Sequence, residues 1–533
     1  MKKNWFGGFL FLLLIVGMAV LLLHDLFQMG VYSSHDGEVH MARLAQFIQA
    51  LQDGNFPVRW LRYWNNGWGY PTFVYVYQLP YWMGTVLYRF IPNVEIVFKL
   101  LMWLSLAGSG VSFFVWVRKH TPLLSAFLAS VMYMGAPYRM ADIYERGALG
   151  EALFFVVAPL LFLVSDKGSL LVALVTFAAL TTHALTFGVF FVPLIIYVWI
   201  TKKKRGDFFK FLVGIGLGAG LAGFQLLPMI GEQKYVRLDI TYYQIFTDHF
   251  VDFGKLLRLP GVDVGTGIQL GIVQGLILAV MMVVVVKEWR KINVIEVFFV
   301  IVSLVAMLLI LPLSKILWEK TLFWLLFPWR FLTLTTFTTA ALGGFLFTRF
   351  ALERRWWIIP IILLAMLYPS RHFWRGARYH SFPQYYYATY TDPLRLDTYV
   401  LPRGVDDVVM ATPPELKLLS GKGSVALVER TTSSLTVGAV VYTFAAVQFP
   451  IMYFPGWNLT IDGKTQPIAV DYPGLHGVIV GLVPEGKHTL KLQFGDTSLR
   501  AWGGYLSLVS VVIMLILVGI EYRFLWQRGS KYI

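Results

Sequence analysis

The sequence lacks cysteine and has few charged residues. The absence of cysteine excludes disulfide bonds and thiolate chemistry. Only 14% of the 533 residues are charged, whereas a soluble protein carries about a quarter. The chain has 30 acidic residues against 45 Lys and Arg, and 57% of its residues are hydrophobic. This composition predicts an integral membrane protein whose basic excess flanks the membrane spans and does not serve a nucleic-acid partner.

Long apolar segments predict a polytopic α-helical protein with about twelve transmembrane helices. The first segment has no clear cleavage site, and we interpret it as an uncleaved span with a cytoplasmic N-terminus. The boundary between the fifth and sixth segments is hard to place. The segments lie at 8–28, 96–117, 122–137, 150–165, 168–186, 187–200, 208–228, 268–286, 293–312, 331–348, 356–369 and 501–521.

The distribution of basic residues supports this topology. If the N-terminus is cytoplasmic, every short loop on the cytoplasmic side is basic, as the positive-inside rule requires. We therefore expect a multi-pass plasma-membrane protein with both termini in the cytoplasm. These loops carry Arg118-Lys119, Lys167, Lys202-Lys203-Lys204-Arg205, Lys287/Arg290/Lys291, Arg349/Arg354/Arg355 and Arg523/Arg528/Lys531.

Four segments are then expected outside the membrane: 29–95, 138–149, 229–267 and 370–500. Residues 72–91 also look like a span, but counting them as one would reverse the side of every later loop. We therefore interpret them as aromatic helices that lie along the membrane interface.

The chain divides into a transmembrane module at 1–369, an extracytoplasmic domain at 370–500 and a last span with a basic tail at 501–533. The extracytoplasmic domain alternates apolar and polar residues, with turn signals at Asp462-Gly463 and Glu485-Gly486, which predicts a β-sandwich inserted before the last helix. Its role stays open between binding a sugar, covering the active site and stabilising the outer face.

The stretch "HDGEVHMARL" (35–44) places an unusual charged cluster just after the first span. If the chain is helical from Asp36, then Asp36, His40 and Arg43 fall on one helix face. The helix macrodipole favours an ionised carboxylate at such a start. This carboxylate could accept a proton from an attacking group or bind a divalent metal. A single acid at a membrane surface is otherwise an ordinary solvated residue.

A second outer segment, "YRMADIYERGAL", spaces Asp142, Glu145 and Arg146 as neighbours on a helix. These residues could be a salt-bridged loop helix, or an acidic and cationic element that faces the first loop across a cavity. Arg330, in "LFPWRFL", lies at the outer end of a span. It could snorkel to the interface or bind a phosphate through its planar guanidinium.

These features together resemble the GT-C glycosyltransferase superfamily, whose members transfer a sugar from a polyprenyl-phosphate carrier outside the membrane. More narrowly, the chain resembles the YfhO-type and 6-pyruvoyl-tetrahydropterin-synthase-related membrane proteins of bacteria and archaea. The resemblance covers nearly the whole chain. It rests on "HDGEVHMARL" (35–44), "GNFPVRWLRYWNNGWGYPTFVY" (54–75), "APYRMADIYERGALGEAL" (136–153), "TTHALTF" (181–187), "FPWRFL" (327–332) and "YFPGWNLTIDGK" (453–464).

The resemblance implies glycosyl transfer from a polyprenyl-phosphate-linked sugar to a glycan, lipid or polymer of the cell envelope. Asp36 matches the first-loop catalytic acid, and Glu145 or Asp142 matches the second-loop acid. The substrate-binding candidates are His35, His40, Arg146, Arg330, Trp68, Tyr70 and His183. Aromatic residues such as Trp68 and Tyr70 could stack on a sugar or simply anchor the interface.

The resemblance implies no pterin chemistry, because the metal-ligand histidines of the soluble synthase are not recognisable. It implies no definite cofactor, but it leaves open a divalent metal, Mg²⁺ or Mn²⁺, at Asp36 and Glu145. Two other classes of protein stay open. One is a transporter or flippase of a lipid-linked sugar, although the acids here gather near the outer edge and not at mid-membrane. The other is a non-catalytic envelope scaffold.

Overall fold

The apolar segments form a bundle of helices, because a helix is the structure that satisfies all backbone polar groups within lipid. We describe a computed structural model, which covers residues 2–202, 204–237, 246–258, 267–391, 401–405 and 412–529. Lys203 and Lys531 of the predicted basic loops lie outside these residues. The main helices are α1 (Lys2–Leu22), α5 (Val94–Val117), α6 (Leu123–Met134), α8 (Leu149–Val164), α9 (Ser169–Thr201), α10 (Arg205–Leu221), α11 (Gly223–Gly231), α14 (Ile272–Lys287), α15 (Val294–Ile310), α17 (Phe331–Arg349), α18 (Ile359–Leu367) and α21 (Ser498–Gly529).

Four described helices are long and apolar enough to cross a membrane: Val94–Val117, Ser169–Thr201, Pro328–Arg349 and Ser498–Ile520. Two bent pairs, Arg205–Leu221 with Gly223–Gly231 and Val294–Ile310 with Pro312–Leu325, raise this number to six if each pair is one span. Five further apolar helices are shorter. The chain is thus a membrane protein with several apolar helices, but the predicted number of twelve spans is not confirmed.

The fifth and sixth predicted spans form one 33-residue stretch, α9, which bends at His183 (φ −164°, ψ 87°). Both ends of α9 lie beside the first half of α10. The rings of Trp199 and Phe208 are 5.1 Å apart, and a Cβ atom on Gly214 would come within 2.7 Å of the Ser169 carbonyl oxygen. The two halves of α9 therefore run in opposite directions, and His183 lies at the turn between them.

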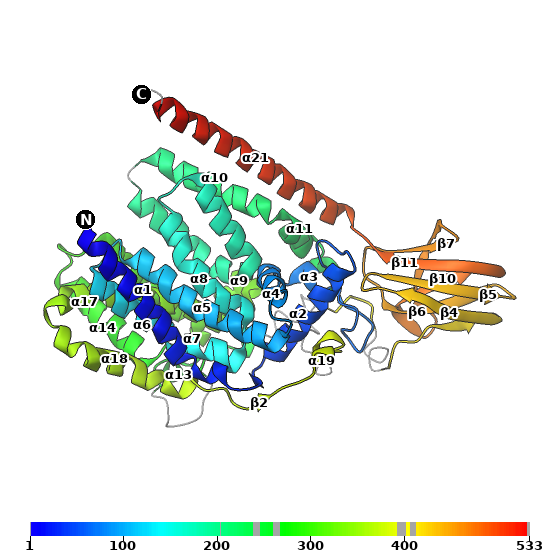
Figure 1. The fold of residues 1–533 in the computed structure, drawn as a ribbon, viewed down its shortest axis with the longest axis horizontal. Helices are drawn as coiled ribbons and strands as arrows, with labels where there is room; N and C mark the ends of the chain where they lie inside the picture. Colours follow the sequence, from blue (N-terminus) through cyan, green and yellow to red (C-terminus); the bar gives the residue numbers. More distant parts are fainter. Residues whose placement is uncertain are drawn as a thin grey trace.

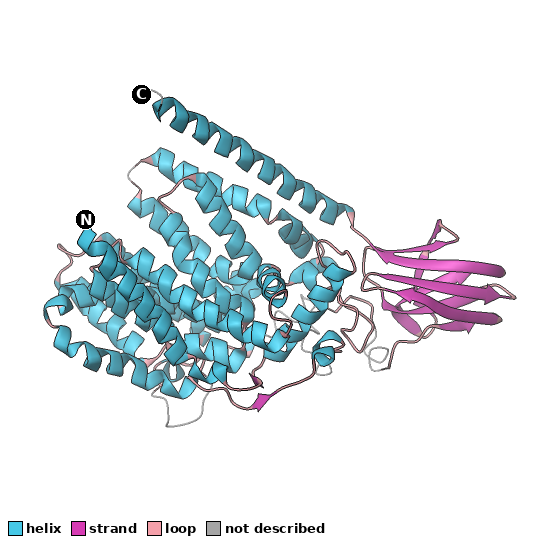
Figure 2. Cartoon of the chain, in the orientation of Figure 1, coloured by secondary structure: helices cyan, strands magenta, loops and turns pink. Residues whose placement is uncertain are grey.

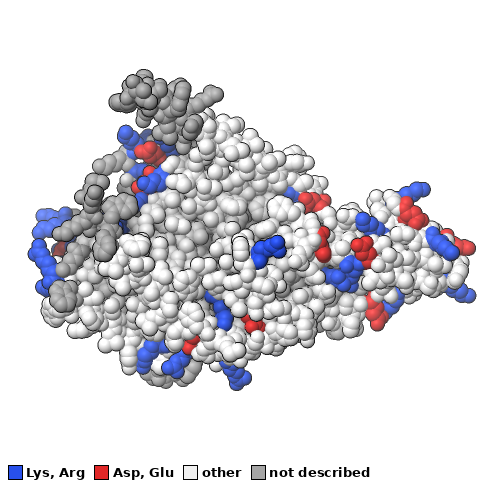
Figure 3. Space-filling view, in the orientation of Figure 1, with Lys and Arg blue, Asp and Glu red and all other residues white. Residues whose placement is uncertain are grey.

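The two helices at the ends of the chain, α1 and α21, point their termini toward the same side of the bundle (Figure 1). A space-filling view shows a broad uncharged surface between basic residues on that side and the charged β domain at the opposite end (Figure 3). α21 is almost entirely exposed along its apolar length, with only 11% of its most apolar window buried, as expected of a helix that faces lipid.

The predicted interfacial segment 72–91 forms two short helices, α3 (Thr72–Tyr75) and α4 (Leu79–Tyr88). The ten residues of α4 rise only about 15 Å, half of the apolar thickness of a bilayer, so this segment does not form a spanning helix. α4 packs on α2 (Gly37–Gln52) and α5, and so these elements of the first outer loop form a compact layer on one end of the bundle.

The strands from β3 to β11 gather in one domain beyond the helices (Figure 2). One sheet has the order β3-β6-β10-β9 and the other β4-β5-β11-β7-β8, all neighbours being antiparallel. The strands are β3 (Lys417–Ser420), β4 (Gly423–Arg430), β5 (Ser434–Val441), β6 (Ala445–Met452), β7 (Trp457–Ile461), β8 (Lys464–Gln466), β9 (Ile468–Tyr472), β10 (Leu475–Val483) and β11 (Gly486–Phe494).

The two predicted turns behave differently. Asp462 and Gly463 both have positive φ and join β7 to β8 in a tight hairpin, which confirms the first prediction. The hairpin prediction at Glu485-Gly486 is wrong, because β10 pairs with β6 and β9 whereas β11 pairs with β5 and β7. This turn carries the chain from one sheet to the other, and a turn signal alone cannot distinguish these two connections.

Before the first strand of this domain, the chain crosses the first outer loop. β2 (Tyr379–His380) pairs with β1 (Val31–Tyr32), and α19 (Gln384–Ala388) packs on α2. Glu95 at the start of α5 accepts hydrogen bonds from the Phe382 amide (2.8 Å) and the Tyr387 hydroxyl (2.7 Å). The segment that precedes the β domain therefore packs against the first loop and restrains it. Residues 392–400 and 406–411 of the predicted 370–500 domain lie outside the described residues.

A buried ion pair joins the β domain to the helices. Arg500, at the start of α21, contacts Glu232 with an Nη2–Oε2 distance of 2.9 Å, and both side chains are buried. Arg500 also donates to the carbonyl oxygens of Gly495 (3.0 Å) and Pro455 (2.9 Å). Because these carbonyls belong to the β domain, the ion pair fixes where that domain leaves the membrane module.

At the far end of the β domain, His488 Nδ1 lies 2.7 Å from Asp462 Oδ2. The Thr489 amide and His488 lower the pKa of Asp462, and the hydrogen bond to Asp462 raises the pKa of His488. The stabilisation by charged His488 is therefore complete below about pH 6.5 and is lost as the pH rises through the raised folded-state pKa. NMR titration of labelled histidine should give His488 a pKa above the ordinary value, and Asp462→Asn should remove the increase. An unchanged pKa in that variant would contradict the role of this pair.

Candidate functional site

The first and second outer loops meet at the start of α2. The His35 amide donates to the Glu145 carbonyl (2.9 Å), and the Asp36 amide donates to the Arg146 carbonyl (2.8 Å). Gly147, with φ +63°, allows this approach, since a Cβ there would lie 3.0 Å from the Gly37 nitrogen. The predicted acidic segments are therefore side by side.

α2 begins at Gly37, so Asp36 immediately precedes its first turn, as predicted. Asp36 is partly exposed, and its backbone carbonyl accepts from the His40 amide (2.9 Å). His40 and Arg43 follow on the same helix face, and both are buried. His40 Nδ1 is 2.7 Å from the Tyr81 hydroxyl. Burial lowers the pKa of His40 well below its usual range, aided by the positive charge of Arg43, so His40 is neutral at pH 7.

The second loop forms a buried ion-pair network. Arg146 Nη1 lies 2.8 Å from Asp142 Oδ1 and 2.8 Å from Glu151 Oε2, while Arg139 Nη1 lies 3.7 Å from Asp142 Oδ2. Asp142 and Arg146 lie at the two ends of a π-helical turn, which brings their side chains within ion-pair distance. The salt bridges expected of a loop helix do form, and they lie inside the protein.

Glu151 connects this network to the helices. Its Oε1 accepts from the Tyr138 hydroxyl (2.6 Å) and from the Thr333 hydroxyl on α17 (2.8 Å). A buried carboxylate is costly unless it is paired and hydrogen-bonded, and Glu151 meets both conditions. It therefore positions Arg146 against the first turn of α17.

Arg330, just before α17, is buried and acts electrostatically on Glu151 and Arg146. Its Nη1 donates to the Leu325 carbonyl, and its guanidinium carbon lies 5.3 Å from the centre of the Phe327 ring. Within the described residues, no carboxylate lies within ion-pair distance of Arg330, and its Nε has no hydrogen-bond partner. Among the residues that the structure describes, Arg330 is thus a buried cation whose charge is not directly paired.

His183, at the bend of α9, completes this region. Its Nδ1 contacts the Thr186 hydroxyl at 2.8 Å, and its ring lies 5.2 Å from the ring of Tyr77. It also interacts electrostatically with Arg330 and Arg146. We use the term inner cluster for the residues that these contacts and charge interactions connect: Asp36, His40, Arg43, Arg139, Asp142, Arg146, Glu151, His183 and Arg330.

The inner cluster has four arginines against three carboxylates, so it carries a net positive charge when its histidines are neutral. Two of the carboxylates, Asp142 and Glu151, are buried in ion pairs with arginines. Such an arrangement favours a ligand with negative charge, because an anion would compensate the remaining guanidinium. A phosphate is the simplest group of this kind.

The predicted acids differ in accessibility. Asp142 is fully buried between two arginines, which leaves it no access to a substrate. Asp36 and Glu145 are partly exposed, and His35 is exposed. Glu145 Oε2 accepts from the Gly267 amide at 2.6 Å. Asp36 is therefore the strongest candidate for a group that contacts a substrate, while Asp142 acts as a positioning residue.

Two predicted aromatic residues lie elsewhere. Trp68 and Tyr70 are buried between the first loop and the rest of the chain. The Trp68 indole donates to the Thr412 carbonyl (2.8 Å), and the Trp68 carbonyl accepts from the Met452 amide (3.0 Å) in the β domain. Tyr70 pairs with Leu61 through the backbone. Neither ring is open to a sugar, and both instead join the first loop to its surroundings.

Residue patterns alone did not identify Glu151, Tyr138 and Tyr77 as parts of the site. The available signal was an acid in the first turn of an otherwise apolar helix, since Glu151 is the only charged residue of α8. The Tyr77 hydroxyl oxygen accepts a hydrogen bond from the Gly150 amide (3.0 Å), and so it fixes the start of the same helix. No sequence spacing connects these residues to Asp36.

The site does not fit a divalent metal. The described part of the chain contains no group of three or more His, Asp or Glu residues that could bind an ion. Asp142 and Glu151 already pair with arginines, and Glu145 accepts a backbone hydrogen bond. Guanidinium groups among the donors would repel a cation, so we derive no step through a metal at Asp36 and Glu145.

A comparison with protein families gives one match. A family model described as 6-pyruvoyl-tetrahydropterin synthase related domain, membrane protein, matches residues 73–373. This range contains the second-loop network, His183 and Arg330, whereas Asp36 and the β domain lie outside it. No curated protein matches the chain. Because the match covers more than half of the sequence, the chain belongs to the family of 6-pyruvoyl-tetrahydropterin-synthase-related membrane proteins.

Proposed function

We propose that this protein is an extracytoplasmic glycosyltransferase of the GT-C type. Its donor is a polyprenyl-phosphate-linked sugar and its acceptor a glycan, lipid or polymer of the cell envelope. In this proposal the protein lies in the plasma membrane with both termini in the cytoplasm, and the inner cluster faces the outer side. The family match supports the membrane location but names no glycosyl transfer.

The observation that carries the proposal is the position of Asp36. Asp36 is partly exposed and lies at the end of a buried, net positive cluster that extends to Arg330 at the start of α17. A base beside a group of cations is what transfer from a sugar phosphate needs. The base receives the proton of the acceptor, and the cations stabilise the phosphate that leaves.

The reaction is a single displacement. Asp36 accepts the proton of the acceptor hydroxyl while its oxygen forms a bond to the anomeric carbon. The bond between that carbon and the phosphate oxygen breaks, and the polyprenyl phosphate leaves with the electron pair. Arg330 compensates the charge that develops on this phosphate. Arg146 assists Arg330, and Asp142 and Glu151 hold Arg146 in place. The anomeric configuration is inverted.

The class of function is tested by comparing envelope glycans from cells with and without this protein. Loss of one glycan, lipid or polymer modification, restored by the wild-type chain and not by Asp36→Asn, is the expected result. Identical glycan profiles in all strains would reject glycosyl transfer.

Arg330→Ala should raise the KM for the donor by about tenfold to a hundredfold, because a hydrogen bond to a charged group is lost. The KM for the acceptor should not change. Arg349→Ala is the matched control at the other end of α17, where Arg349 pairs with Glu296 (2.8 Å). Steady-state kinetics with purified protein in lipid discs measure both constants. An unchanged donor KM in Arg330→Ala would remove the phosphate role.

Transport of a lipid-linked sugar is the second candidate function. The bend of α9 at His183 and the two sharply bent helix pairs favour it, because discontinuous helices with buried ionisable residues are common in transporters. Sealed vesicles that contain the protein distinguish the two candidates. A transporter moves the labelled lipid across the bilayer unchanged, whereas a transferase releases polyprenyl phosphate.

A further inference from the structure

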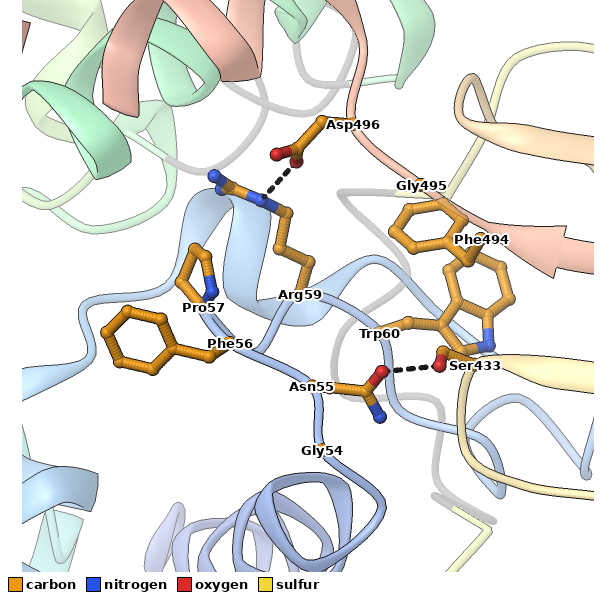
Figure 4. A pocket seen from close by; sticks show the side chains of 10 residues that line it. All are labelled: Gly54, Asn55, Phe56, Pro57, Arg59, Trp60, Ser433, Phe494, Gly495 and Asp496. Atoms are coloured by element: carbon orange, nitrogen blue, oxygen red, sulfur yellow. Dashed lines mark hydrogen bonds and ion pairs between the residues drawn. The ribbon is translucent and has the colours of Figure 1, made fainter. Parts of the chain in front are cut away.

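A cavity of about 200 Å³ lies where the first outer loop meets the β domain (Figure 4). Its lining begins at Gly54, just after α2 ends. The cavity therefore lies at the opposite end of that helix from Asp36. The 16 residues of α2 correspond to about 24 Å between Asp36 and the cavity. Its lining includes the side chains of Asn55, Phe56, Arg59, Trp60, Phe494 and Asp496.

The polar side chains of this cavity are built into the fold. Arg59 is only 5% exposed, and its Nε lies 3.4 Å from Asp496 Oδ1, while Nη2 donates to the Phe224 carbonyl (3.2 Å). Within the described residues, Nη1 of Arg59 has no hydrogen-bond partner, and almost none of its surface is accessible. Arg59 therefore shapes the wall of the cavity and holds Asp496 in place. Asp496 is 52% exposed and still offers acceptor capacity.

Aromatic rings and an amide form the other walls. Phe56 is 80% exposed, and the ring centres of Trp60 and Phe494 lie 5.2 Å apart. The Asn55 amide is oriented by Thr432 (2.6 Å) and by the Ser433 hydroxyl, which donates to the Asn55 oxygen. Figure 4 shows Asn55 and Trp60 on the side of the loop that faces Ser433 and Phe494 of the β domain, with Phe56 on the other side of the loop backbone.

The charge of the cavity differs from that of the inner cluster. Arg59 is compensated by Asp496, so this cavity has no excess positive charge for a phosphate. Exposed aromatic surface, a carboxylate acceptor and an amide suit a neutral ring with many hydroxyl groups. The volume equals that of about seven waters, the scale of one sugar ring and less than that of a drug-sized ligand.

We propose that this cavity holds one neutral sugar unit of the acceptor, at a distance from the reacting end. The acceptor would then be a glycan chain, because a single sugar cannot reach from the cavity to Asp36 over about 24 Å. The sugar-binding site itself is independent of catalysis, whereas its identification as an acceptor site rests on the proposed function.

Binding is tested with the full-length protein in lipid discs by saturation-transfer NMR and calorimetry. The probes are neutral gluco-, galacto- and manno-oligosaccharides and chitin oligomers, together with oligogalacturonate and inorganic phosphate as anionic probes. At least one neutral probe should bind, and the anionic probes should not compete with it. Absence of binding by the whole neutral panel, or displacement by the anionic probes, would overturn the proposal.

The variants Phe56→Ala and Asp496→Asn should weaken this binding by up to about tenfold, the size of one lost aromatic or polar contact. Phe56 is exposed, so its substitution should not disturb folding. Asp496→Asn also removes the charge partner of buried Arg59, so its Tm is measured beside its affinity. Phe90→Ala is the matched control, because Phe90 is 79% exposed and belongs to the same outer loop but does not line the cavity. If all three variants and the wild type bind the neutral probe with equal affinity, this cavity is not the sugar-binding site.

Asp36→Asn separates this inference from the proposed function. It should bind the neutral probe as the wild type does while losing transfer. If Asp36→Asn retains transfer, the proposed base is wrong but the sugar site stands. If the cavity variants bind normally while Asp36→Asn is inactive, the sugar site is wrong and the proposed function stands.

Discussion

Replacing Asp36 by Asn should lower kcat for sugar transfer by about 10²- to 10⁴-fold, the usual contribution of a general base. Asn has nearly the same shape and keeps the backbone contacts with His40 and Arg146, so the fold should be unchanged. Because the proposed phosphate-binding arginines lie elsewhere, the affinity for the donor should change little. Single-turnover kinetics with purified protein measure the chemical step directly.

Glu38→Gln is the matched control for this experiment. Glu38 is an acid two residues away on the same helical turn, and it accepts a hydrogen bond from Tyr386 on the outer connection. Its substitution removes a charge near Asp36 without removing the proposed base. Equal losses in both variants would indicate a general electrostatic effect, and near-normal transfer by Asp36→Asn would end the role of Asp36 as a base.

Replacing Arg146 by Met should destabilise the protein by about 3–5 kcal/mol, because it leaves Glu151 buried without its cation and removes one of the two partners of Asp142. Thermal unfolding in detergent should show a large decrease in Tm and a loss of donor binding. The double variant Arg146→Met with Glu151→Gln should recover part of this stability, since the unpaired buried carboxylate is then neutral.

The control is an ion pair in a solvent-exposed loop. Lys119 contacts Asp166 at 3.0 Å, and both side chains are substantially exposed. Asp166→Asn should therefore cost less than about 1 kcal/mol. If Arg146→Met has an effect as small as Asp166→Asn, the second-loop network does not hold the inner cluster together.

The local predictions for the outer loops depend on neighbouring residues and largely agree with the structure. The spacing of Asp36, His40 and Arg43 predicts one helix face, and α2 places His40 and Arg43 together on its buried side. Likewise, the spacing of Asp142 and Arg146 predicts an ion pair within the second loop, and this pair forms. Such contacts follow from helical geometry, which the sequence encodes directly.

The predictions that required long-range information are less successful. Trp68 looks like a sugar platform in the sequence, but the β domain covers it, with Met452 more than 380 residues away in the chain. The turn at Glu485 looks like a hairpin, but β11 pairs with β5 and β7. Burial and strand pairing depend on residues distant in sequence, and a single sequence contains no record of those contacts.

Hydropathy, charge and turn chemistry act over a few residues, so they suffice to predict a membrane protein with a charged cluster after its first apolar segment and a β-rich domain. Long-range packing decides that Glu151 joins Arg146 to α17, that Asp142 is too buried to act on a substrate, and that Arg59 and Asp496 line one cavity. The reason is physical. Whether a charge is solvated, paired or open to a ligand depends on which distant segments surround it, and packing alone fixes those neighbours.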